Sequence, residues 1–473
     1  MVVTVLPSIL LGLRIPLTRL DSASWIVTGY LLGYTVAMPL FGRVADVRGK
    51  RMMLTVALAV FVMGSALCVL SRNLNMLIAA RVVQAAGGGA LVPISMSIAT
   101  EIFPEYRRAL ALGIIGAAAE AGGVLGPVYG AGMASLGGWK LIFLVNVPLG
   151  ALMGLGAWIL LGNLLRHRVA PGGVSRVDYI GAALMAAALA SLTIGLGGNS
   201  EVGALGVKPW WIAGSVIAFA VFVVWELRQT EPLVQLSFFK KIPFTAANIA
   251  SFAVGAALVV GMVEIPLYAY SLLGKSEVEG GLLLMRLTVM IPVGAVMGGW
   301  LADKLGYAVS AVAGFLAIAA GYLLITRWSL QPGEWLMTRD LALAGLGFGL
   351  VIAPLGAAVI AAVGKAWTAT GSALVTVTRM MGMTVGLAAL SSWGIRRFNA
   401  LMADTPLPLR GPEMTDAQYS ALVQAYDQTI SEALKTLYAN FFLICAAIAL
   451  FAVVPALLLG RGLPRSRTPL PPL

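Results

Sequence analysis

Long, uninterrupted runs of apolar residues, separated by short charged or turn-rich segments, constrain this chain more than any other feature. One helix needs about 20 apolar residues to cross a bilayer. Hydrocarbon offers no partner to an unpaired backbone group, so spanning segments must be helices or a closed barrel. The runs are continuous rather than alternating, which excludes a barrel. Of all residues 59% are hydrophobic and 11% charged, whereas soluble domains have about 25% charged residues. The sequence therefore predicts an all-α membrane protein.

The apolar runs predict about fourteen transmembrane helices. They fall at 1–13, 24–42, 52–70, 75–100, 109–134, 139–161, 178–197, 209–228, 244–271, 280–299, 309–326, 340–362, 371–395 and 436–459. No cleavable signal peptide precedes them. The first run is short and opens at Met1 without a polar lead, so we expect that the first helix is clipped.

Basic residues set the expected orientation. The net charge is +12, which in a soluble protein would suggest a nucleic-acid partner. In a membrane protein, Lys and Arg collect in cytoplasmic loops instead. With the amino end inside, more than half of the 32 Lys and Arg residues fall on the cytoplasmic side. We therefore predict a multi-pass protein of the cytoplasmic membrane with both termini cytoplasmic, and no nucleic-acid partner.

The longest polar segment, 399–435, is predicted to form an external loop. Thr415 and Gln418 have the spacing of a capping box at a helix start. Apolar residues then recur at helical spacing from Tyr419 to Leu434. The pattern predicts an amphipathic helix lying on the outer membrane surface.

One pattern, G-x-x-A-D-x-x-G, occurs twice, at 42–49 and at 299–306, each time between two predicted membrane helices. The copies lie about half the chain apart, which predicts two homologous halves. The first Gly permits close helix approach, the Asp can accept from an exposed helix amino terminus or an Arg, and the last Gly permits a tight turn. Such a latch could hold the halves together on the cytoplasmic side; the alternative is an ordinary turn. The expected gating residues are Gly42, Asp46, Gly49, Arg51 and Asp303.

The repeat predicts three parts of the chain. Residues 1–161 would form an amino-terminal six-helix bundle, and 243–473 a carboxy-terminal six-helix bundle that carries the external loop. Residues 162–242 would supply two extra helices between them.

Five ionisable residues fall inside predicted membrane helices: Arg81, Glu120, Glu264, Arg286 and Arg379. A central Asp, Lys or Arg costs about 2.5–3.5 kcal/mol on insertion scales, so retained charges are candidates for function. Low dielectric favours the neutral form of Glu120, which could then exchange a proton with either side or neutralise a cationic substrate. The alternative is a structural carboxyl bonded to a neighbouring helix.

The other four charges have structural alternatives as well. Glu264 and Arg286 lie at similar depth and could form a buried salt bridge, which would keep Glu264 ionised. The guanidinium of Arg81 suits a carboxylate such as Glu120, in a relay or in a plain link between helices. For Arg379, nearer the cytoplasmic side, we expect a structural ion pair.

Three motifs resemble those of the major facilitator superfamily, and most closely its fourteen-helix drug:proton antiporter family. Residues 42–51 resemble the superfamily's loop signature. Residues 81–89 resemble its fourth-helix motif, with Ala85 in place of a Gly. Residues 122–130 resemble its fifth-helix antiporter motif, with Ala131 in place of the final Gly.

Two further segments support the resemblance. Residues 371–382 are similar to a late-helix pattern of the fourteen-helix family, and residues 3–9 to the end of its first-helix motif. The acidic residue that usually precedes the latter motif is absent, which agrees with a clipped first helix.

The resemblance implies a major facilitator fold, with two six-helix bundles and two linker helices around a midplane cavity. It implies a proton relay at Arg81. It also implies a hinge on the fifth helix, where Gly122, Gly126 and Gly130 share one face and Pro127 adds a bend. Simple tight packing is the alternative for these glycines.

We therefore expect a secondary transporter that exports small amphipathic compounds or drugs in exchange for protons, using Glu120, Glu264 and Arg81. The alternative is a proton-coupled uptake symporter or a uniporter of a small organic solute. A receptor or a lipid-acting membrane enzyme is a third class, disfavoured because the sequence has no catalytic cluster. We expect no enzyme activity, cofactor or metal, a monomeric protein, and a small molecule, protons and the bilayer as its partners.

Overall fold

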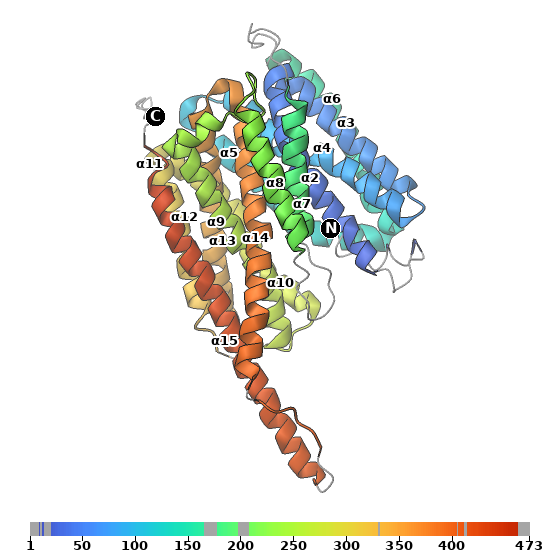
Figure 1. Cartoon of the computed structure of the whole chain (residues 1–473), viewed down its shortest axis with the longest axis vertical. Helices are drawn as coiled ribbons and strands as arrows, with labels where there is room; N and C mark the ends of the chain where they lie inside the picture. The colour runs from blue at the N-terminus through green and yellow to red at the C-terminus, as the bar shows by residue number, and fades with distance from the viewer. Residues whose placement is uncertain are drawn as a thin grey trace.

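The computed structural model describes residues 9, 12–13, 20–164, 177–196, 208–329, 332–403, 405–410 and 414–461. Within these ranges every regular element is a helix (Figure 1). Twelve helices are long and apolar enough to cross a membrane, and α5 (Arg108–Gly137) is a further helix of 30 residues. The predicted all-α membrane fold is confirmed. The first predicted span, 1–13, lies almost wholly outside the described residues.

The helices follow one another with short connections. Their bounds are α2 Leu20–Arg48, α3 Lys50–Leu70, α4 Leu74–Ile102, η3 Glu105–Arg107, α5 Arg108–Gly137, α6 Trp139–Leu164, α7 Tyr179–Leu196, α8 Pro209–Glu226, η4 Leu236–Lys240, α9 Ile242–Ser271, α10 Glu277–Thr288, α11 Met290–Leu305, α12 Tyr307–Ile325, α13 Glu334–Val363, η5 Lys365–Trp367, α14 Thr368–Met402 and α15 Asp416–Leu457. Polar caps fix several starts: the side chain of Asn73 accepts from Met76 N at α4, and Ser276 and Glu279 form a capping box at α10.

Helices pack in two groups joined by a few cross-contacts. In one group α4 packs against α2 and α3, and α3 against α6. In the other, α9 packs against α13, α14 and α15, and α12 against α13 and α15. The main contacts between the groups are those of α5 with α11 and α13 and those of α14 with α2 and α4, while α7 and α8 pack on each other and α7 on α2. The division at 161 and 242 stays a prediction.

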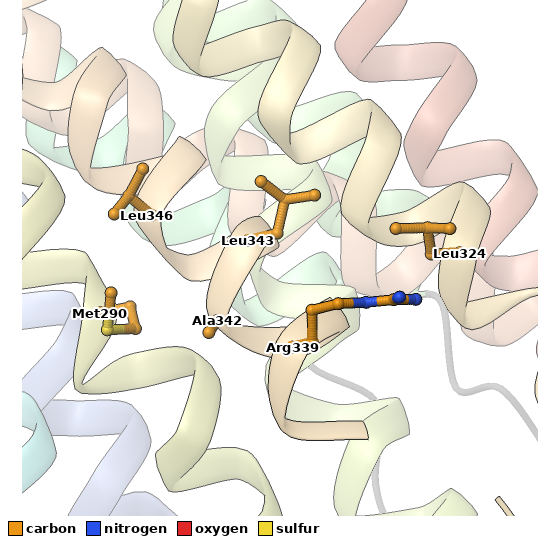
Figure 2. A pocket seen from close by; sticks show the side chains of 6 residues that line it. All are labelled: Met290, Leu324, Arg339, Ala342, Leu343 and Leu346. Carbon is orange, nitrogen blue, oxygen red and sulfur yellow. The ribbon is translucent and has the colours of Figure 1, made fainter. Parts of the chain in front are cut away.

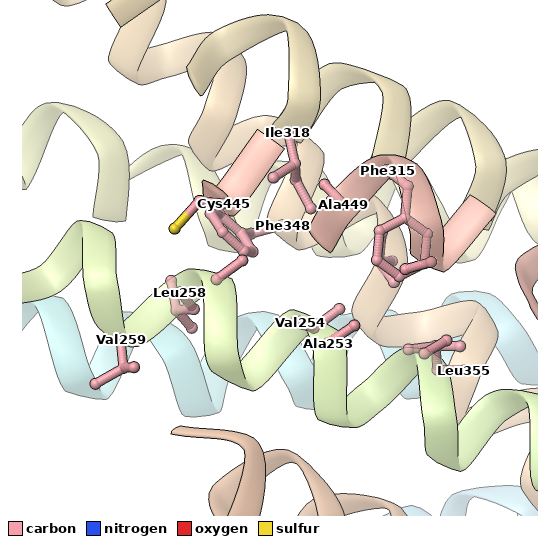
Figure 3. Packing of buried hydrophobic residues seen from close by; sticks show 14 of the residues in the cluster. Ala253, Val254, Leu258, Val259, Phe315, Ile318, Phe348, Leu355, Cys445 and Ala449 are labelled. Carbon is pink, nitrogen blue, oxygen red and sulfur yellow. The ribbon is translucent and has the colours of Figure 1, made fainter. Parts of the chain in front are cut away.

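Small residues let the helices of the second group approach closely. A Cβ added at Gly382 of α14 would lie 2.1 Å from the carbonyl oxygen of Phe252 on α9. Larger side chains fill the space around such contacts, and Phe315 of α12, Phe348 of α13 and Cys445 of α15 belong to one buried apolar cluster (Figure 3). Lipid tails are as apolar as these side chains, so close packing rather than the hydrophobic effect holds such helices together.

The expected surface helix within 399–435 is wrong. The capping box of Thr415 and Gln418 does begin a helix, but that helix continues without a break into the membrane as α15, which has 42 residues. No Gly or Pro occurs between Asp416 and Val454 to end or bend it. α14 likewise runs on to Met402. The first turns of α15 therefore project from the bundle beyond the end of α14 (Figure 1), and 403–415 connects the two helices.

We predict that Gly382→Ala destabilises the protein, although Ala is the better helix former by about 1 kcal/mol. The new methyl group would overlap the α9 backbone, and such overpacking costs about 1–3 kcal/mol. Thermal unfolding of purified protein in detergent measures the effect. Gly156→Ala is the matched control, because a Cβ there meets nothing within 4 Å. Equal melting temperatures for the two variants would show that α9 and α14 are not in close contact.

Candidate functional site

Asp46, in the last turns of α2, caps the start of α14 in the other helix group. Its Oδ1 accepts from Ala369 N at 3.0 Å, and its Oδ2 accepts from Thr370 N and from the Thr370 hydroxyl, both at 2.8 Å. The first backbone N–H groups of a helix have no partner within it and carry a partial positive charge. A carboxylate from one group thus satisfies the helix start of the other.

Asp303, the second copy of the motif's acid, makes the mirror contact. It lies near the end of α11, and its two oxygens accept from Ala109 N at 3.0 Å and Leu110 N at 2.8 Å, at the start of α5. The direction is reversed, since the acid now comes from the second helix group and the helix start from the first. We call these two carboxylates and the four backbone amides they bind the latch.

The glycines of the motif allow the latch to form. A Cβ at Gly42 would lie 3.0 Å from the Ala369 carbonyl oxygen, and one at Gly299 would lie 2.4 Å from that of Ala109. Gly49 and Gly306, which end each motif, have φ of 103° and 95°, a region that favours Gly. Both copies of the motif therefore form the close helix approach and the tight turn that their glycines predicted. Its role in gating stays a prediction.

Further polar residues join the latch at α14, and the sequence analysis did not single them out. Lys50 forms an ion pair with Glu101 and donates to the Thr368 hydroxyl at 2.9 Å. Ser97 of α4 also bonds to Thr368. The sign of this cluster in the sequence was Lys50, which directly follows the last Gly of the first motif copy.

Arg51, an expected gating residue, lies elsewhere. Its guanidinium stacks 4.0 Å from the ring centroid of Trp158 on α6 and donates to the Trp158 carbonyl. Arg43 instead lies at the junction, 3.6 Å over the Trp367 ring just before α14. Arg43 and Arg51 thus contact different neighbours, and of these two only Arg43 reaches the second helix group.

An ion pair deeper in the bundle joins α5 and α14, the two helices whose starts the latch binds. Arg379 Nη1 of α14 lies 3.0 Å from Glu120 Oε1 of α5, and both side chains are 21% exposed. Glu120 is thus paired with Arg379 and not with Arg81, the partner suggested from the sequence. Arg379 does form the ion pair expected of it, and its partner comes from the other helix group.

Arg81 is buried in α4 beside neutral groups. Its Nη1 donates to Gln84 Oε1 at 2.6 Å, and its guanidinium lies 3.9 Å from the ring centroid of Tyr30. Tyr30 stacks on Tyr34 with centroids 6.0 Å apart. Tyr34 in turn lies within electrostatic range of Glu120 and Arg379. A row of aromatic rings on α2 therefore connects Arg81 with the ion pair, and the four-residue spacing of the two tyrosines was its sequence signal.

The predicted salt bridge between Glu264 and Arg286 is wrong. Arg286 pairs with Glu334 at 2.6 Å and donates to the Thr338 hydroxyl, both in the first turn or two of α13. Glu264 is buried in α9, near Tyr438 and Cys445 of α15. Within the described part of the chain it has no hydrogen-bond or ion-pair partner. Glu264 and Arg286 lie at similar depth on their helices, but their side chains point in different directions, which the sequence alone does not show.

The fifth-helix glycines are not all contact points. Gly126 and Gly130 are buried, as expected for a packing face. A Cβ at Gly122 would meet nothing within 4 Å, so the expected close contact is wrong there. The side chain of Pro127 lies outside the described residues. A hinge on this helix stays a prediction.

Comparison with known proteins identifies the family. A family model described as the Major Facilitator Superfamily matches residues 1–387. A triacylglyceride transporter of Mycobacteroides abscessus is 40% identical over 451 residues, which cover 90% of this chain and 86% of that protein. A triacylglyceride transporter of Mycobacterium tuberculosis is 36% identical over 480 residues, covering 97% and 90%.

Two solved structures are similar in fold. The human organic anion transporter MFSD10 (TETRAN) matches with a TM-score of 0.55 at 14% identity, covering 94% of this chain and 88% of that one. The proton:xylose symporter XylE matches with a TM-score of 0.56 at 14% identity, covering 96% and 90%. At this identity the likeness concerns the fold alone.

We predict that Asp46→Ala opens the closed end of the bundle. Loss of a helix cap costs about 0.5–2 kcal/mol, a shift in the opening equilibrium of a few-fold to about thirtyfold. The reporter is Met96→Cys, a buried position that contacts Ser372 of α14, in a Cys68→Ser, Cys445→Ser background. Maleimide labelling of this Cys should be faster in Asp46→Ala by the same factor.

Asp416→Ala is the control for this measurement, because Asp416 is an exposed first-turn acid of α15 remote from the latch. If Asp46→Ala and Asp416→Ala label at the same rate, the latch does not hold the two groups closed.

Proposed function

The chain belongs to the major facilitator superfamily, and on that premise we propose that it exports a neutral, acylglycerol-like lipophile by proton-driven alternating access. It is a multi-pass membrane transporter.

The Glu120–Arg379 pair carries this proposal. It is the one ion pair among the described residues that joins α5 and α14, the two helices whose starts the latch holds. Protonation would neutralise Glu120 and remove its attraction for Arg379. The two helices could then separate, and a proton taken up on one side would favour the state open to the other.

The charge balance of this pair supports a neutral substrate. A carboxylate and a guanidinium 3.0 Å apart compensate each other, so the site offers little net charge to an ion. An uncharged ester lipid would not compete with either charge for its partner. Relatives that match nearly the whole chain are called triacylglyceride transporters, which supports the same class.

Export of amphipathic cations or drugs is the second candidate. The buried carboxyl of Glu264, which has no ion-pair partner among the described residues, favours it. An anionic side chain in a low-dielectric site attracts a lipophilic cation strongly. Competition between such a cation and a labelled acylglycerol would separate the two substrate classes.

The latch end is proposed to face the cytoplasm. Basic residues concentrate in the loops on that side, as in cytoplasmic loops generally. A structure closed by the latch would then be closed toward the cytoplasm, and release of the latch would admit substrate from the inner leaflet.

We predict that Glu120→Gln abolishes transport driven by a pH gradient. Gln cannot bind or release a proton, so the imposed gradient should no longer accelerate movement of a fluorescent triacylglycerol out of proteoliposomes. The exposed acid Glu432, on the projecting part of α15, provides the control Glu432→Gln. Full coupling in Glu120→Gln would remove this residue from the mechanism.

We predict a smaller effect for Glu264→Gln, because this carboxyl links no pair of helices across the two groups. Acylglycerol flux should stay within about threefold of the unmodified protein, a change near 0.7 kcal/mol. Flux of a lipophilic cation should fall much further if that second candidate holds. Loss of both activities together would place Glu264 in proton coupling instead.

The direction of transport distinguishes the alternative of an uptake symporter or a uniporter. Export in exchange for protons requires substrate to move against the inward proton flow. Substrate that follows the protons would identify a symporter, and flux indifferent to the gradient a uniporter.

A further inference from the structure

An open pocket of about 530 Å³ lies between α11, α12 and α13, away from the ion pair. Its lining is Met290, Leu324, Arg339, Ala342, Leu343 and Leu346 (Figure 2). Five of these side chains are apolar. Arg339 is the one charged residue of the lining, and Figure 2 shows its side chain extending toward the α12 side of the pocket, near Leu324.

The depth of the pocket along α13 matches the edge of a bilayer. α13 has 30 residues and is thus about 45 Å long, whereas the hydrocarbon core is about 30 Å thick. A centred α13 would extend about 7–8 Å beyond the core at each end, which corresponds to about five residues. Arg339 is the sixth residue of the helix, so it lies at this boundary, and Leu343 and Leu346 lie deeper. Trp335, one turn outside Arg339, is 79% exposed, as expected of a Trp at the interface.

A buried acid holds the guanidinium in place. Nε and Nη2 of Arg339 both lie 2.8 Å from Oδ1 of Asp340. The Asp340 side chain is fully buried and also accepts from Trp328 Nε1 at 2.9 Å. Among the described residues, Nη1 of Arg339 has no partner. The Arg339 side chain is 49% exposed, so its guanidinium donors remain available at the mouth of the pocket.

A second arginine follows one of the lining residues along the chain. Arg327 follows Leu324 by three residues in the turn that ends α12, with Arg327 N bonded to Leu324 O. In such a turn side chains three apart eclipse each other, so Arg327 continues the row that begins with Leu324. Asp340 compensates Arg339, and Arg327 adds an exposed positive charge just beyond the end of α12.

We propose that this pocket binds one anionic phospholipid, with its phosphate at Arg339 and Arg327 and an acyl chain along Leu324, Leu343 and Leu346. An apolar groove alone would accept any lipid tail. Guanidinium donors at the depth of the head groups add the charge-assisted hydrogen bonds that select a phosphate. The site lies on the outside of the helix bundle, so it is separate from the substrate path of the proposed function.

Native mass spectrometry of the detergent-purified full chain tests this site. The probes are phosphatidylglycerol, phosphatidylcholine and inorganic phosphate, each at the same molar ratio to protein. The unmodified protein should retain phosphatidylglycerol in preference to phosphatidylcholine. Arg339→Gln should lower the retained fraction by about tenfold, as expected for loss of a hydrogen bond to a charged group. Arg410→Gln is the control, because Arg410 is also exposed and paired with an acid but lies beyond α14, outside the pocket.

Ala342→Phe tests the acyl-chain half of the site, since the ring would fill the pocket and leave both arginines intact. It should also lower retention of phosphatidylglycerol about tenfold. Arg339→Gln leaves Asp340 buried without its cation and could therefore fail to fold. In that case Ala342→Phe and Arg339→Lys test the site in its place. The conservative Lys variant should retain an intermediate fraction.

Three results would overturn the proposal. They are equal retention of phosphatidylglycerol by Arg339→Gln and Arg410→Gln, full retention by Ala342→Phe, and retention of inorganic phosphate by the unmodified protein equal to that of phosphatidylglycerol. The last would identify a simple anion site. Lipid retention in detergent needs no pH gradient, so these outcomes are independent of whether the transport proposal holds.

Discussion

Carboxylates that bind the backbone amides of helix starts in the opposite helix group are the interaction on which the closed arrangement depends. Asp46 binds the start of α14, and Asp303 binds the start of α5. A helix start presents unpaired N–H groups and a partial positive charge whatever its side chains are. Such a contact joins the two helix groups without requiring particular side chains on the helix that is capped. Water can replace the carboxylate when they separate, so the contact is also reversible.

The latch and the ion pair involve the same two helices, α5 and α14, which is the geometry that the proposed coupling requires. Glu120 lies eleven residues after Ala109 on α5, and Arg379 lies ten after Ala369 on α14. Both are therefore about 15–17 Å from the latched ends. Equal depth on two helices held at their starts lets the two side chains meet. Because a helix is stiff along its axis, a change at the ion pair can reach the latch by a tilt of α5 or α14.

The remaining intramembrane charges show how differently this fold accommodates an ionisable group. Arg81 is surrounded by Gln84 and the Tyr30 ring, so its charge is spread over neutral partners. Arg286 reaches Glu334 at the end of α13, where the bilayer meets water. Glu264 has no such contact within the described residues, and a buried carboxyl without a partner is costly as an anion. These environments assign separate roles to residues that look alike in the sequence.

The sequence by itself determined the helical membrane fold and the repeated motif, because long apolar runs and a fixed spacing of Gly and Asp are local properties of a chain. It also located the five charges in the membrane. Only the tertiary structure decided their partners: Glu120 with Arg379 rather than Arg81, and Arg286 with Glu334 rather than Glu264. Hydropathy gives the depth of a residue along its helix and says nothing about the direction in which its side chain points. Likewise, a capping box predicted where α15 begins, but the absence of a helix breaker over the following turns decided that it continues into the membrane.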